Sequence, residues 1–442
     1  MPSSALVALR EKIENNSLTI GVIGLGYVGL PLCLTFLRKG TAVIGFDLDI
    51  NKIKRIEKGE SYIKHIPSSE LTSHVDNASF TVTTDFTKLN MPDVLLICVP
   101  TPLTKNREPD LQYITATAEA ISKALRPGQI IILESTTYPG TTVEVLQPIL
   151  EKSGLEAGVD FGLAFSPERE DPGNPKFATA NIAKVVGGID ANSSELAQKI
   201  YQIALEKVIP VSSTQIAEMT KLLENIFRSV NIALVNELKM LCLRMDISVW
   251  EVIDAASTKP FGYMPFYPGP GLGGHCIPID PFYLTSKARE FDIPTRFIEL
   301  AGEINSNMPY FVVQRVMEAL NEHGKSLNGS CLLILGAAYK KDVDDDRESP
   351  TYKLLDLLLD KGAEVGYHDP HIPALRPGRK HNYSLSSTPL TADNLSAADC
   401  IIVATDHSAY DYDFILKHAK LIVDTRNVFI DKEGASKKVF MS

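Results

Sequence analysis

One cysteine lies in a segment that is too rich in glycine and proline to be a helix or a central strand. Cys276 belongs to the run PGPGLGGHCIPID, which ends at Asp280. Four glycines between positions 269 and 274 let the backbone approach a ligand closely and present amide groups to an anion. A thiolate nucleophile is chemically reasonable in such a loop, and a structural cysteine in a turn is the alternative.

A second set of reactive side chains follows a helical spacing. Lys221, Asn225 and Arg228 are separated by four and three residues, so they share one face of a helix. That helix is expected from about Thr214 to Arg244, because apolar residues recur there every three or four positions without a proline or glycine. By spacing alone, a solvated polar face is the favoured explanation of the three residues, because Lys, Asn and Arg are common on exposed helices.

Further charged residues come directly after predicted strands. Glu168 and Arg169 follow one strand in the first half of the chain, and Lys340, Arg347 and Arg426 follow strands in the last third. Ligands of open α/β sheets bind at the carboxyl ends of the strands, where cations can hold a phosphorylated group. We therefore expect the carboxy-terminal part of the chain to bind a phosphorylated ligand.

A glycine-rich turn predicts a dinucleotide site. In LTIGVIGLGYVGLPL, Gly24, Gly26 and Gly29 form GxGxxG between a predicted strand and a predicted helix, and they enclose Tyr27 and Val28. The first glycine allows the tight turn, the second lets the backbone approach a pyrophosphate, and the third allows close helix packing. A glycine-rich turn without a ligand is the alternative.

The next predicted strand ends at Asp47, 18 residues after Gly29. A carboxylate there accepts hydrogen bonds from the adenosine ribose and repels a 2′-phosphate, which favours NAD over NADP. Lys52 weakens this preference, because a nearby cation attracts such a phosphate. Thr101 and Thr136 follow two further strands and are candidate cofactor contacts, with turn formation as the alternative.

The elements that must position these residues form an α/β protein with two Rossmann-like lobes joined by a long helix within a helical region. Residues 1–210 are expected to form the first lobe, 211–324 the helical domain with the loop 259–281, and 325–442 the second lobe. Predicted strands include LTIGVIG, AVIGFD, VLLICVP, IIILES and KVVGG in the first lobe and CLLILG, AEVGYHD, CIIVATD and LIVDTR in the second.

Composition excludes several classes of protein. A net charge of −10 over 442 residues, without a long run of Lys or Arg, argues against nucleic-acid binding. Neither a signal peptide nor a stretch of about 20 apolar residues is present, so no membrane partner is expected. Four of the six cysteines lie in apolar segments as expected for a reducing compartment, which predicts a cytoplasmic location.

The motifs together resemble those of the UDP-sugar 6-dehydrogenases. GVIGLGYVGLPL, VPTPL, ESTTYPGTT, SPERE, EMTKLLEN, PGPGLGGHCIPIDP, AYKKDVDDDRESP and DTRN occur in that family's order from Gly21 to Asn427. The resemblance implies an NAD-dependent enzyme that acts on a UDP-sugar and forms a homodimer or a larger homo-oligomer. Several segments resemble UDP-N-acetylglucosamine 6-dehydrogenases that supply uronic acids for surface polysaccharides.

The resemblance also assigns roles to residues. It implies that Lys221 and Asn225 lie beside Cys276, with Asp280 close to Lys221, and that Glu168 is near the reacting carbon. Substrate contacts implied by the resemblance are Arg169, Lys221, Asn225, Arg228, Tyr267, Gly273, Lys340, Arg347 and Arg426. No residue is assigned to a metal, because His368 and His371 lack a further ligand pattern. The acidic run from Asp342 to Asp346 is expected to be a solvated loop that positions Arg347.

One departure concerns the sugar. UDP-glucose dehydrogenases of this superfamily commonly carry an arginine upstream of the catalytic loop, where this chain has Thr258-Lys259-Pro260-Phe261-Gly262. Loss of a forked donor and gain of aromatic bulk argue against plain UDP-glucose and favour a 2-acetamido sugar. UDP-GlcNAc is expected, with UDP-ManNAc, UDP-GalNAc and UDP-glucose as alternatives.

The resemblance implies a four-electron oxidation at C6. Lys221 or a water bound to Asp280 accepts the proton of the alcohol, and the Cys276 thiolate adds to the resulting aldehyde. A thiohemiacetal and then a thioester follow, before hydrolysis to the acid. A single-step hydroxyacid dehydrogenase is the rival enzyme class, and a non-catalytic nucleotide-sugar binding protein is the rival of another class.

Overall fold

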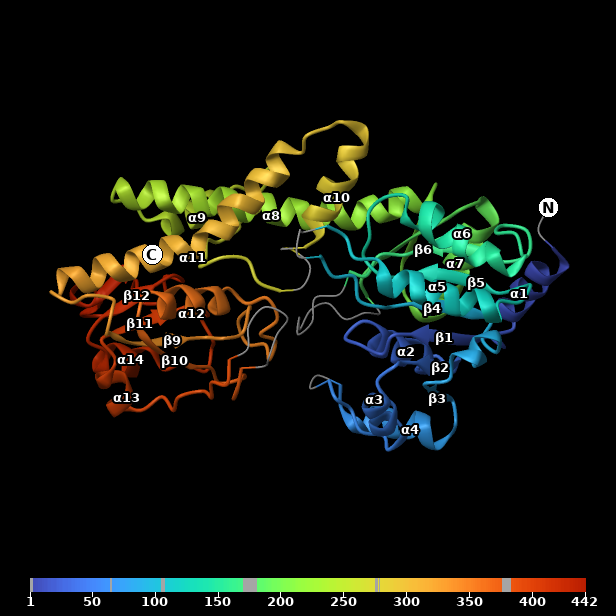
Figure 1. The fold of residues 1–442 in the computed structure, drawn as a ribbon, viewed down its shortest axis with the longest axis horizontal. Coiled ribbons are helices and arrows are strands. Elements are labelled where there is room, and N and C mark those ends of the chain that lie inside the picture. Colours follow the sequence, from blue (N-terminus) through green and yellow to red (C-terminus); the bar gives the residue numbers. More distant parts are fainter. Residues whose placement is uncertain are drawn as a thin grey trace. The chain divides into compact units, whose positions relative to one another are not determined.

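The computed structural model describes residues 3–63, 66–104, 108–169, 181–274, 277, 279–375 and 383–442. The chain folds into two compact units (Figure 1). The amino-terminal unit contains Met1–Glu224 and Phe282–Asp292, and the carboxy-terminal unit contains Asn225–Pro281 and Ile293–Ser442.

The amino-terminal unit is built on an eight-stranded sheet with the order β3-β2-β1-β4-β5-β6-β7-β8. Neighbouring strands are parallel except for β6 and β7, which are antiparallel. The strands are β1 (Thr19–Ile23), β2 (Ala42–Phe46), β3 (Phe80–Thr83), β4 (Val94–Ile97), β5 (Ile130–Leu133), β6 (Gly162–Phe165), β7 (Lys184–Gly188) and β8 (Val208–Val211).

Helices cover both faces of this sheet, because successive side chains of its buried strands enter two different cores. Val94 and Leu96 of β4 join one core cluster, and Leu95 and Ile97 join the other. The helices are α1 (Ser4–Glu14), α2 (Gly29–Leu37), α3 (Ile50–Glu57), α4 (Ser68–Asp76), α5 (Gln112–Ala124), α6 (Gln147–Leu150) and α7 (Ala191–Ala204), with the short turns η1 (Phe86–Asn90), η2 (Thr142–Leu146), η3 (Glu151–Ser153) and η4 (Arg289–Phe291).

The carboxy-terminal unit contains a second sheet, which is parallel throughout and has the order β10-β9-β11-β12-β13. Its strands are β9 (Cys331–Leu335), β10 (Glu364–His368), β11 (Cys400–Val403), β12 (Ile422–Asp424) and β13 (Val439–Met441). Its further helices are α9 (Val249–Ser257), α11 (Arg296–Glu322), α12 (Pro350–Asp360), α13 (Ala392–Ala397), α14 (Tyr412–His418) and the short η5 (Ala435–Lys437).

The strand orders identify where each sheet can bind a ligand. In the first sheet, β1 is followed in the chain by β2 on one side and later by β4 on the other. In the second sheet β9 is likewise followed in the chain by β10 on one side and later by β11 on the other. Connections leave the carboxyl edge in opposite directions at such switch points and open a crevice there. The predicted fold class, two Rossmann-like lobes with a helical region, is confirmed.

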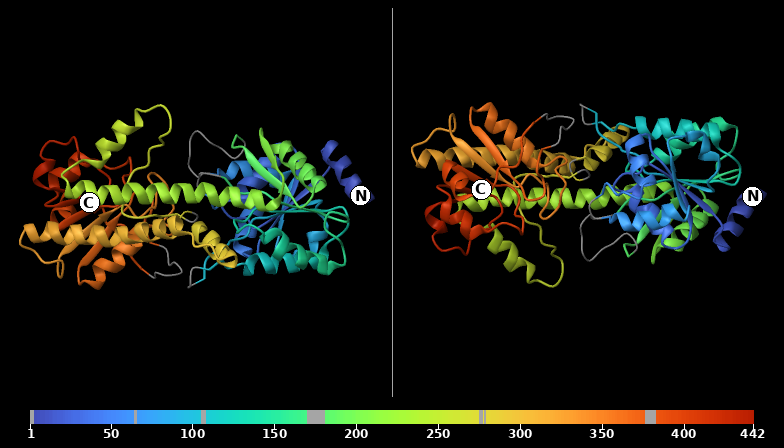
Figure 2. Two further views of the ribbon diagram at one scale, coloured as in Figure 1. Left: turned by 90° about the horizontal axis from the view of Figure 1, so that it is seen from above. Right: turned by 90° about the horizontal axis from the view of Figure 1, so that it is seen from below.

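Two helices contribute residues to both units. Helix α8 (Thr214–Arg244) has the bounds predicted from its apolar spacing, and Figure 2 shows that it is uninterrupted. The shorter α10 (Asp280–Ala288) crosses the same division of the chain. Leu234, Leu238 and Leu241 on α8 are exposed, and the homodimer or larger homo-oligomer implied by the resemblance stays a prediction.

Strand prediction succeeded for the most apolar strands and missed three others. All nine runs named from the sequence form strands, and β6 is the strand expected before Glu168, whereas β3, β8 and β13 were not predicted. These three are short, with three or four residues each, and are only partly buried. None of the helices in the described ranges is long and apolar enough to span a bilayer.

A buried carboxylate organises the carboxyl edge of the second sheet. Asp369, directly after β10, accepts hydrogen bonds from the backbone amides of Ala337 and Ala338 at 2.7 and 2.8 Å. It also accepts from His371 N at 2.7 Å and lies 3.0 Å from His407 Nε2. Burial opposes ionisation, but the hydrogen bonds, led by that of His407, lower the pKa of Asp369 to about 2.

Replacing Asp369 tests whether its carboxylate stabilises the carboxy-terminal unit. Because the folded pKa lies below the ordinary value of 3.8, Asp369 stabilises the unit above about pH 4 and loses that contribution as the pH falls toward 2. We expect Asp369→Asn to lower the free energy of unfolding at pH 7 by about 2 kcal/mol or more. The only tryptophan, Trp250, lies in the same unit, so its fluorescence during urea unfolding is the measurement. Asp360→Asn, at an exposed position, is the control. The prediction would be contradicted if wild type and Asp369→Asn differed in the free energy of unfolding by the same amount at pH 7 and at pH 3.

Candidate active site

The glycine-rich turn after β1 is shaped by two close backbone contacts and one open position. Gly24 has φ +94°, and a Cβ built on it would lie 2.6 Å from the carbonyl oxygen of Cys98. A Cβ on Gly29, the first residue of α2, would lie 1.9 Å from the carbonyl oxygen of Gly24. At Gly26 no atom lies within 4 Å of the added Cβ. Glycine at 24 and 29 is therefore required by the fold, while the open space at 26 fits an approaching pyrophosphate.

Asp47 ties the end of β2 to this turn. Its Oδ2 accepts a hydrogen bond from Leu25 N at 2.9 Å, and its Oδ1 accepts one from Asp49 N at 2.9 Å. Lys52 Nζ donates to Oδ2 at 2.9 Å, so the cation suspected of weakening the NAD preference is paired with the carboxylate itself. Asp47 keeps unused lone pairs for a ribose hydroxyl.

The remaining predicted cofactor residues lie around the same switch point. Val28 immediately precedes α2, and Tyr27 packs in part against the core. Thr101 follows β4 and is buried, with its carbonyl accepting from Tyr283 Oη at 2.9 Å. Thr136, after β5, is partly exposed. The next residue was not predicted: the Thr137 hydroxyl is buried and has no hydrogen-bond partner in the part of the chain that is described.

A buried ion pair next to Glu168 was also missed. Lys184 Nζ donates to Glu134 Oε2 at 2.5 Å, and both side chains are almost fully buried. Lys184 Nζ also lies 4.0 Å from the Glu168 carboxylate. Burial alone would lower the pKa of Lys184, but Glu134 and Glu168 raise it above its ordinary value. The only sequence signal is a lysine at the start of the apolar strand KVVGG.

The backbone carbonyl of Glu168 positions the side chain of Lys221. The Lys221 ammonium is buried and donates a hydrogen bond to the carbonyl oxygen of Glu168. Arg169 is also held: its Nη2 lies 2.6 Å from Glu224 Oε1, and its Nη1 donates to Ala183 O at 2.6 Å. A substrate contact by Arg169 would therefore have to share the guanidinium with Glu224.

Within the carboxy-terminal unit, Asn225 and Asp280 form the second part of the predicted catalytic set. Asn225 Nδ2 donates to Asp280 Oδ2 at 2.5 Å, and both side chains are buried. This bond connects α8 to the first residue of α10. Arg228, predicted on the same helix face, is exposed.

The glycine-rich loop packs closely against the second lobe. A Cβ on Gly273 would lie 2.6 Å from the Cβ of Tyr339, and Gly274 N donates to Arg347 O at 3.3 Å. Gly274 has φ +85°, a conformation that favours glycine. Cys276 and His275 lie outside the described residues, so the placement of the predicted nucleophile remains a prediction.

The predicted phosphate-binding cations differ in how they are held. Arg347 Nε and Nη2 donate to Asp345, and Arg426 Nε donates to Ala404 O at 2.9 Å. Lys340 is partly exposed. The expectation that the whole acidic run is solvated is wrong, because Asp346 is buried and accepts from Tyr352 Oη at 2.8 Å.

One predicted substrate contact has another partner. Tyr267 is exposed and its hydroxyl donates to Asp254 Oδ1 at 2.6 Å, so its contact with the substrate stays a prediction.

His371 lies near Asp342 and His407, and this cluster of three residues was not predicted from the sequence. His407 uses both ring nitrogens in hydrogen bonds, with Asp342 N at 3.0 Å and Asp369 at 3.0 Å. Hydrogen bonding thus accounts for both ring nitrogens of His407, while His371 Nε2 lies 3.9 Å from Asp342 Oδ1.

Three family models match the chain in succession. Residues 18–205 match the NAD binding domain of the UDP-glucose/GDP-mannose dehydrogenase family, 215–307 its central domain and 333–431 its UDP binding domain.

Individual relatives cover nearly the whole chain. A UDP-N-acetyl-D-mannosamine dehydrogenase of Methanococcus maripaludis is 35% identical over 424 residues, with 92% of each chain covered. A UDP-N-acetyl-D-glucosamine 6-dehydrogenase of Pseudomonas aeruginosa is 36% identical, with 89% of this chain and 91% of the relative covered. The solved structure of a UDP-D-ManNAc dehydrogenase from Pyrococcus horikoshii superposes with a TM-score of 0.86 at 33% identity, covering 96% of this chain and 99% of the other.

The cofactor preference can be tested at Asp47. Asn keeps an acceptor for Leu25 N but removes the charge, so we expect Asp47→Asn to raise the KM for NAD about tenfold or more and to improve the relative use of NADP. Initial rates with each cofactor are the measurement. Asp49→Asn is the matched control, because Asp49 caps α3 through Asn51 N. Unchanged cofactor kinetics in Asp47→Asn would remove Asp47 from the cofactor site.

Proposed function

This chain belongs to the UDP-glucose/GDP-mannose dehydrogenase family and is an NAD-dependent UDP-sugar dehydrogenase, and we propose that it oxidises the C6 alcohol of a UDP-N-acetylhexosamine to the acid, with UDP-GlcNAc as the preferred substrate. The observation that carries the proposal is the buried hydrogen bond between Asn225 and Asp280, which fixes a carboxamide and a carboxylate at the end of the loop that contains Cys276. The product would supply polysaccharide synthesis.

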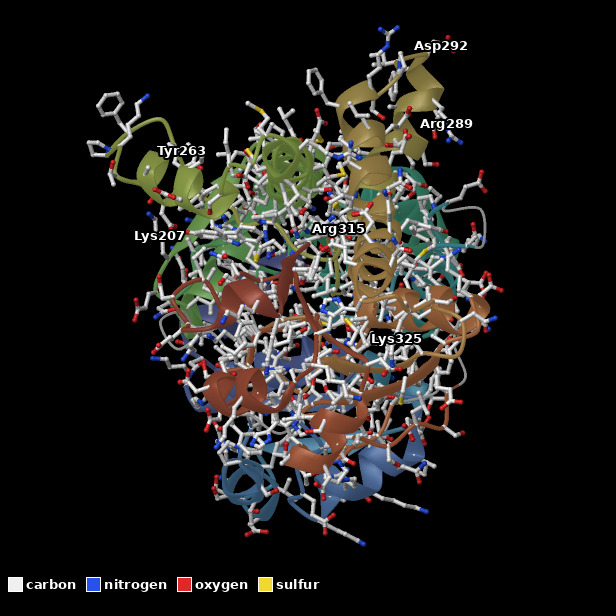
Figure 3. All side chains as sticks on the ribbon, turned by 90° about the vertical axis from the view of Figure 1, so that its left-hand side faces the viewer. Lys207, Tyr263, Arg289, Asp292, Arg315 and Lys325 are labelled. Carbon is white, nitrogen blue, oxygen red and sulfur yellow. The ribbon has the colours of Figure 1, made fainter. Side chains whose placement is uncertain are left out.

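Two observations support an N-acetylated sugar. The relatives include enzymes named for UDP-ManNAc and for UDP-GlcNAc, so UDP-ManNAc is the main alternative, followed by UDP-GalNAc and UDP-glucose. The loop after α9 also lacks the arginine expected of a UDP-glucose enzyme and presents apolar side chains instead. Phe261 is 72% exposed, and Tyr263 on the same loop is labelled in Figure 3.

The cysteine mechanism assigns a task to each side chain. The turn at Gly24–Gly29 and Asp47 would hold NAD, and two NAD molecules bound one after the other would each accept one hydride. The Cys276 thiolate forms a C–S bond to the C6 aldehyde, and the tetrahedral thiohemiacetal places the second hydride for transfer. Water then cleaves the thioester, releasing the acid and the thiol.

The contacts of Lys221 support a stabilising role for its charge. Its ammonium is already oriented as a donor by the Glu168 carbonyl, so together with Asn225 it can stabilise an oxyanion at C6. A water on Asp280 then accepts the proton of the alcohol, while Lys221 is the alternative acceptor. Glu168, near the Lys184 ammonium, positions the hydrolytic water.

The proposed reaction is tested by counting NADH with a panel of UDP-GlcNAc, UDP-ManNAc, UDP-GalNAc and UDP-glucose. We expect two NADH for each acid formed and the highest kcat/KM with UDP-GlcNAc. One NADH per product would indicate the single-step class, and no turnover would indicate a binding protein. A strong preference for UDP-glucose would contradict the reasoning from the Thr258–Gly262 segment.

Covalent catalysis is tested at the loop thiol. Because serine is a much weaker nucleophile, we expect Cys276→Ser to lower the rate of acid formation by about a thousandfold or more while leaving UDP binding intact. Cys331→Ser, an exposed thiol at the start of β9, serves as the matched control. Acid production by Cys276→Ser at a rate near that of the wild type would exclude the thioester.

A further inference from the structure

One lysine of the carboxy-terminal unit is buried without a hydrogen-bond partner among the described residues. Lys239 on α8 is 2% exposed, and its ammonium has no hydrogen-bond partner in the part of the chain that is described. The buried Lys184 and Lys287 differ, since each contacts a carboxylate, at 2.5 and 2.6 Å. Burial of an ammonium without a hydrogen-bond partner disfavours its charged form, so the fold does not fully offset the burial of Lys239.

The charged side chains that act on Lys239 are two arginines and one aspartate, so positive charge exceeds negative charge around it. Arg426 and Asp424, at the end of β12, and Arg315 on α11, labelled in Figure 3, act on Lys239 electrostatically. The ammonium lies over the ring of Trp250, on α9, with Nζ 5.3 Å from the ring centroid. The Asp424 carboxylate accepts from two backbone amides, those of Arg426 at 2.8 Å and Phe429 at 3.2 Å.

The protonation of Lys239 follows from this environment. Burial, and next the charge of Arg426, lower the pKa of Lys239 to about 7, although Asp424 acts in the opposite direction. Arg315 also lowers it, while being paired with Glu318. Near pH 8 the amine is therefore mostly neutral, and an anion arriving beside Arg426 would favour the ammonium.

The location is that of the expected nucleotide site. Asn236, one turn before Lys239, accepts from Gly269 N at 3.0 Å and so holds the glycine-rich loop against this part of α8. A Cβ on Gly269 would lie 2.6 Å from Arg426 Nη1. Arg426 follows β12 at the carboxyl edge of the UDP binding domain, where its guanidinium is the predicted substrate contact.

We propose that Lys239 is a positioning residue of the nucleotide site that takes up a proton when the diphosphate of the substrate binds at Arg426. The inference rests on the proposed function, because it needs a UDP-sugar at this edge. No covalent step is involved: the amine gains one proton from solvent, and the resulting ammonium adds a second positive charge beside the bound anion. Affinity for UDP then depends on pH through Lys239.

Proton uptake on binding is the direct test. Titration calorimetry of the full-length protein with UDP at pH 8, in two buffers of different ionisation enthalpy, should show uptake of up to about one proton. Uridine, which lacks phosphate, should show none. Between pH 7 and 9 wild-type affinity for UDP should fall about tenfold or more, whereas Lys239→Met should bind with a nearly constant affinity and without uptake.

Stability separates this role from a structural one. Because the folded pKa of Lys239 lies below its ordinary value of 10.5, the wild type gains stability as the pH rises from about 7 toward 10, and Lys239→Met should lack this gain. The variant should therefore have the higher Tm, most clearly below pH 7. A structural lysine would instead lower Tm when replaced. Lys239→Gln provides a second, polar variant, and Lys325→Met, at a half-exposed lysine of the same unit, is the matched control.

Each outcome decides a different question. UDP binding by the wild type without proton uptake, or with equal uptake in Lys239→Met, overturns the inference and leaves the proposed function standing. Failure of the wild type to bind UDP at all overturns both. Uptake that is lost in both Lys239 variants but retained in Lys325→Met supports the inference.

Discussion

A parallel sheet covered by helices on both faces leaves one region where polar side chains can gather, namely the edge at which its strands end. Both sheets of this protein obey that constraint. In the first, the glycine turn follows β1 and Asp47 follows β2. In the second, Asp369 follows β10 and Arg426 follows β12. The apolar strands thus determine where the chemistry of each unit takes place, although they contribute no reactive group themselves.

The buried charges of the two units illustrate different solutions to the same electrostatic problem. Lys184 donates directly to Glu134, whose other carboxylate oxygen accepts from the Tyr201 hydroxyl, so the two opposite charges are paired within the protein. That arrangement is complete without a ligand. Lys239 has an aromatic face and two arginines around it, and Asp424 acts on it without a hydrogen bond to its ammonium. Incomplete compensation suits a site that must bind and release an anion, because the bound anion then supplies the negative charge that the protein lacks there.

Features encoded by local spacing could be predicted from the sequence. The turn from Gly24 to Gly29 and the bounds of α8 depend on residues within a few turns of each other, and both were located correctly. Residues whose significance depends on distant partners were not found. Lys184 pairs with a carboxylate 50 positions away, and His407 meets Asp369 across 38. The burial of Asp346 had no sequence signal, because it ends a run of acidic residues that is typical of a solvated loop.

Lys239 shows the same limit within a correctly predicted helix. Periodicity identified which residues of α8 are apolar, but a lysine between them is indistinguishable from a solvent-facing one until the packing of α9, α11 and β12 is known. The Gly269–Asn236 bond likewise joins a loop and a helix that are 33 positions apart.

The continuity of α8 has a consequence for any attempt to divide the protein. Glu218, near the start of this helix, is buried and accepts hydrogen bonds from Gly140 N at 2.6 Å and from Thr142 N at 2.9 Å. An amino-terminal fragment that stops at residue 210, where the sequence pattern changes, would leave both amides without their acceptor. A fragment ending after Glu224 keeps them but cuts a helix in the middle. Both units therefore depend on residues of α8. An exchange of one lobe between relatives must include the part of α8 that belongs to that lobe.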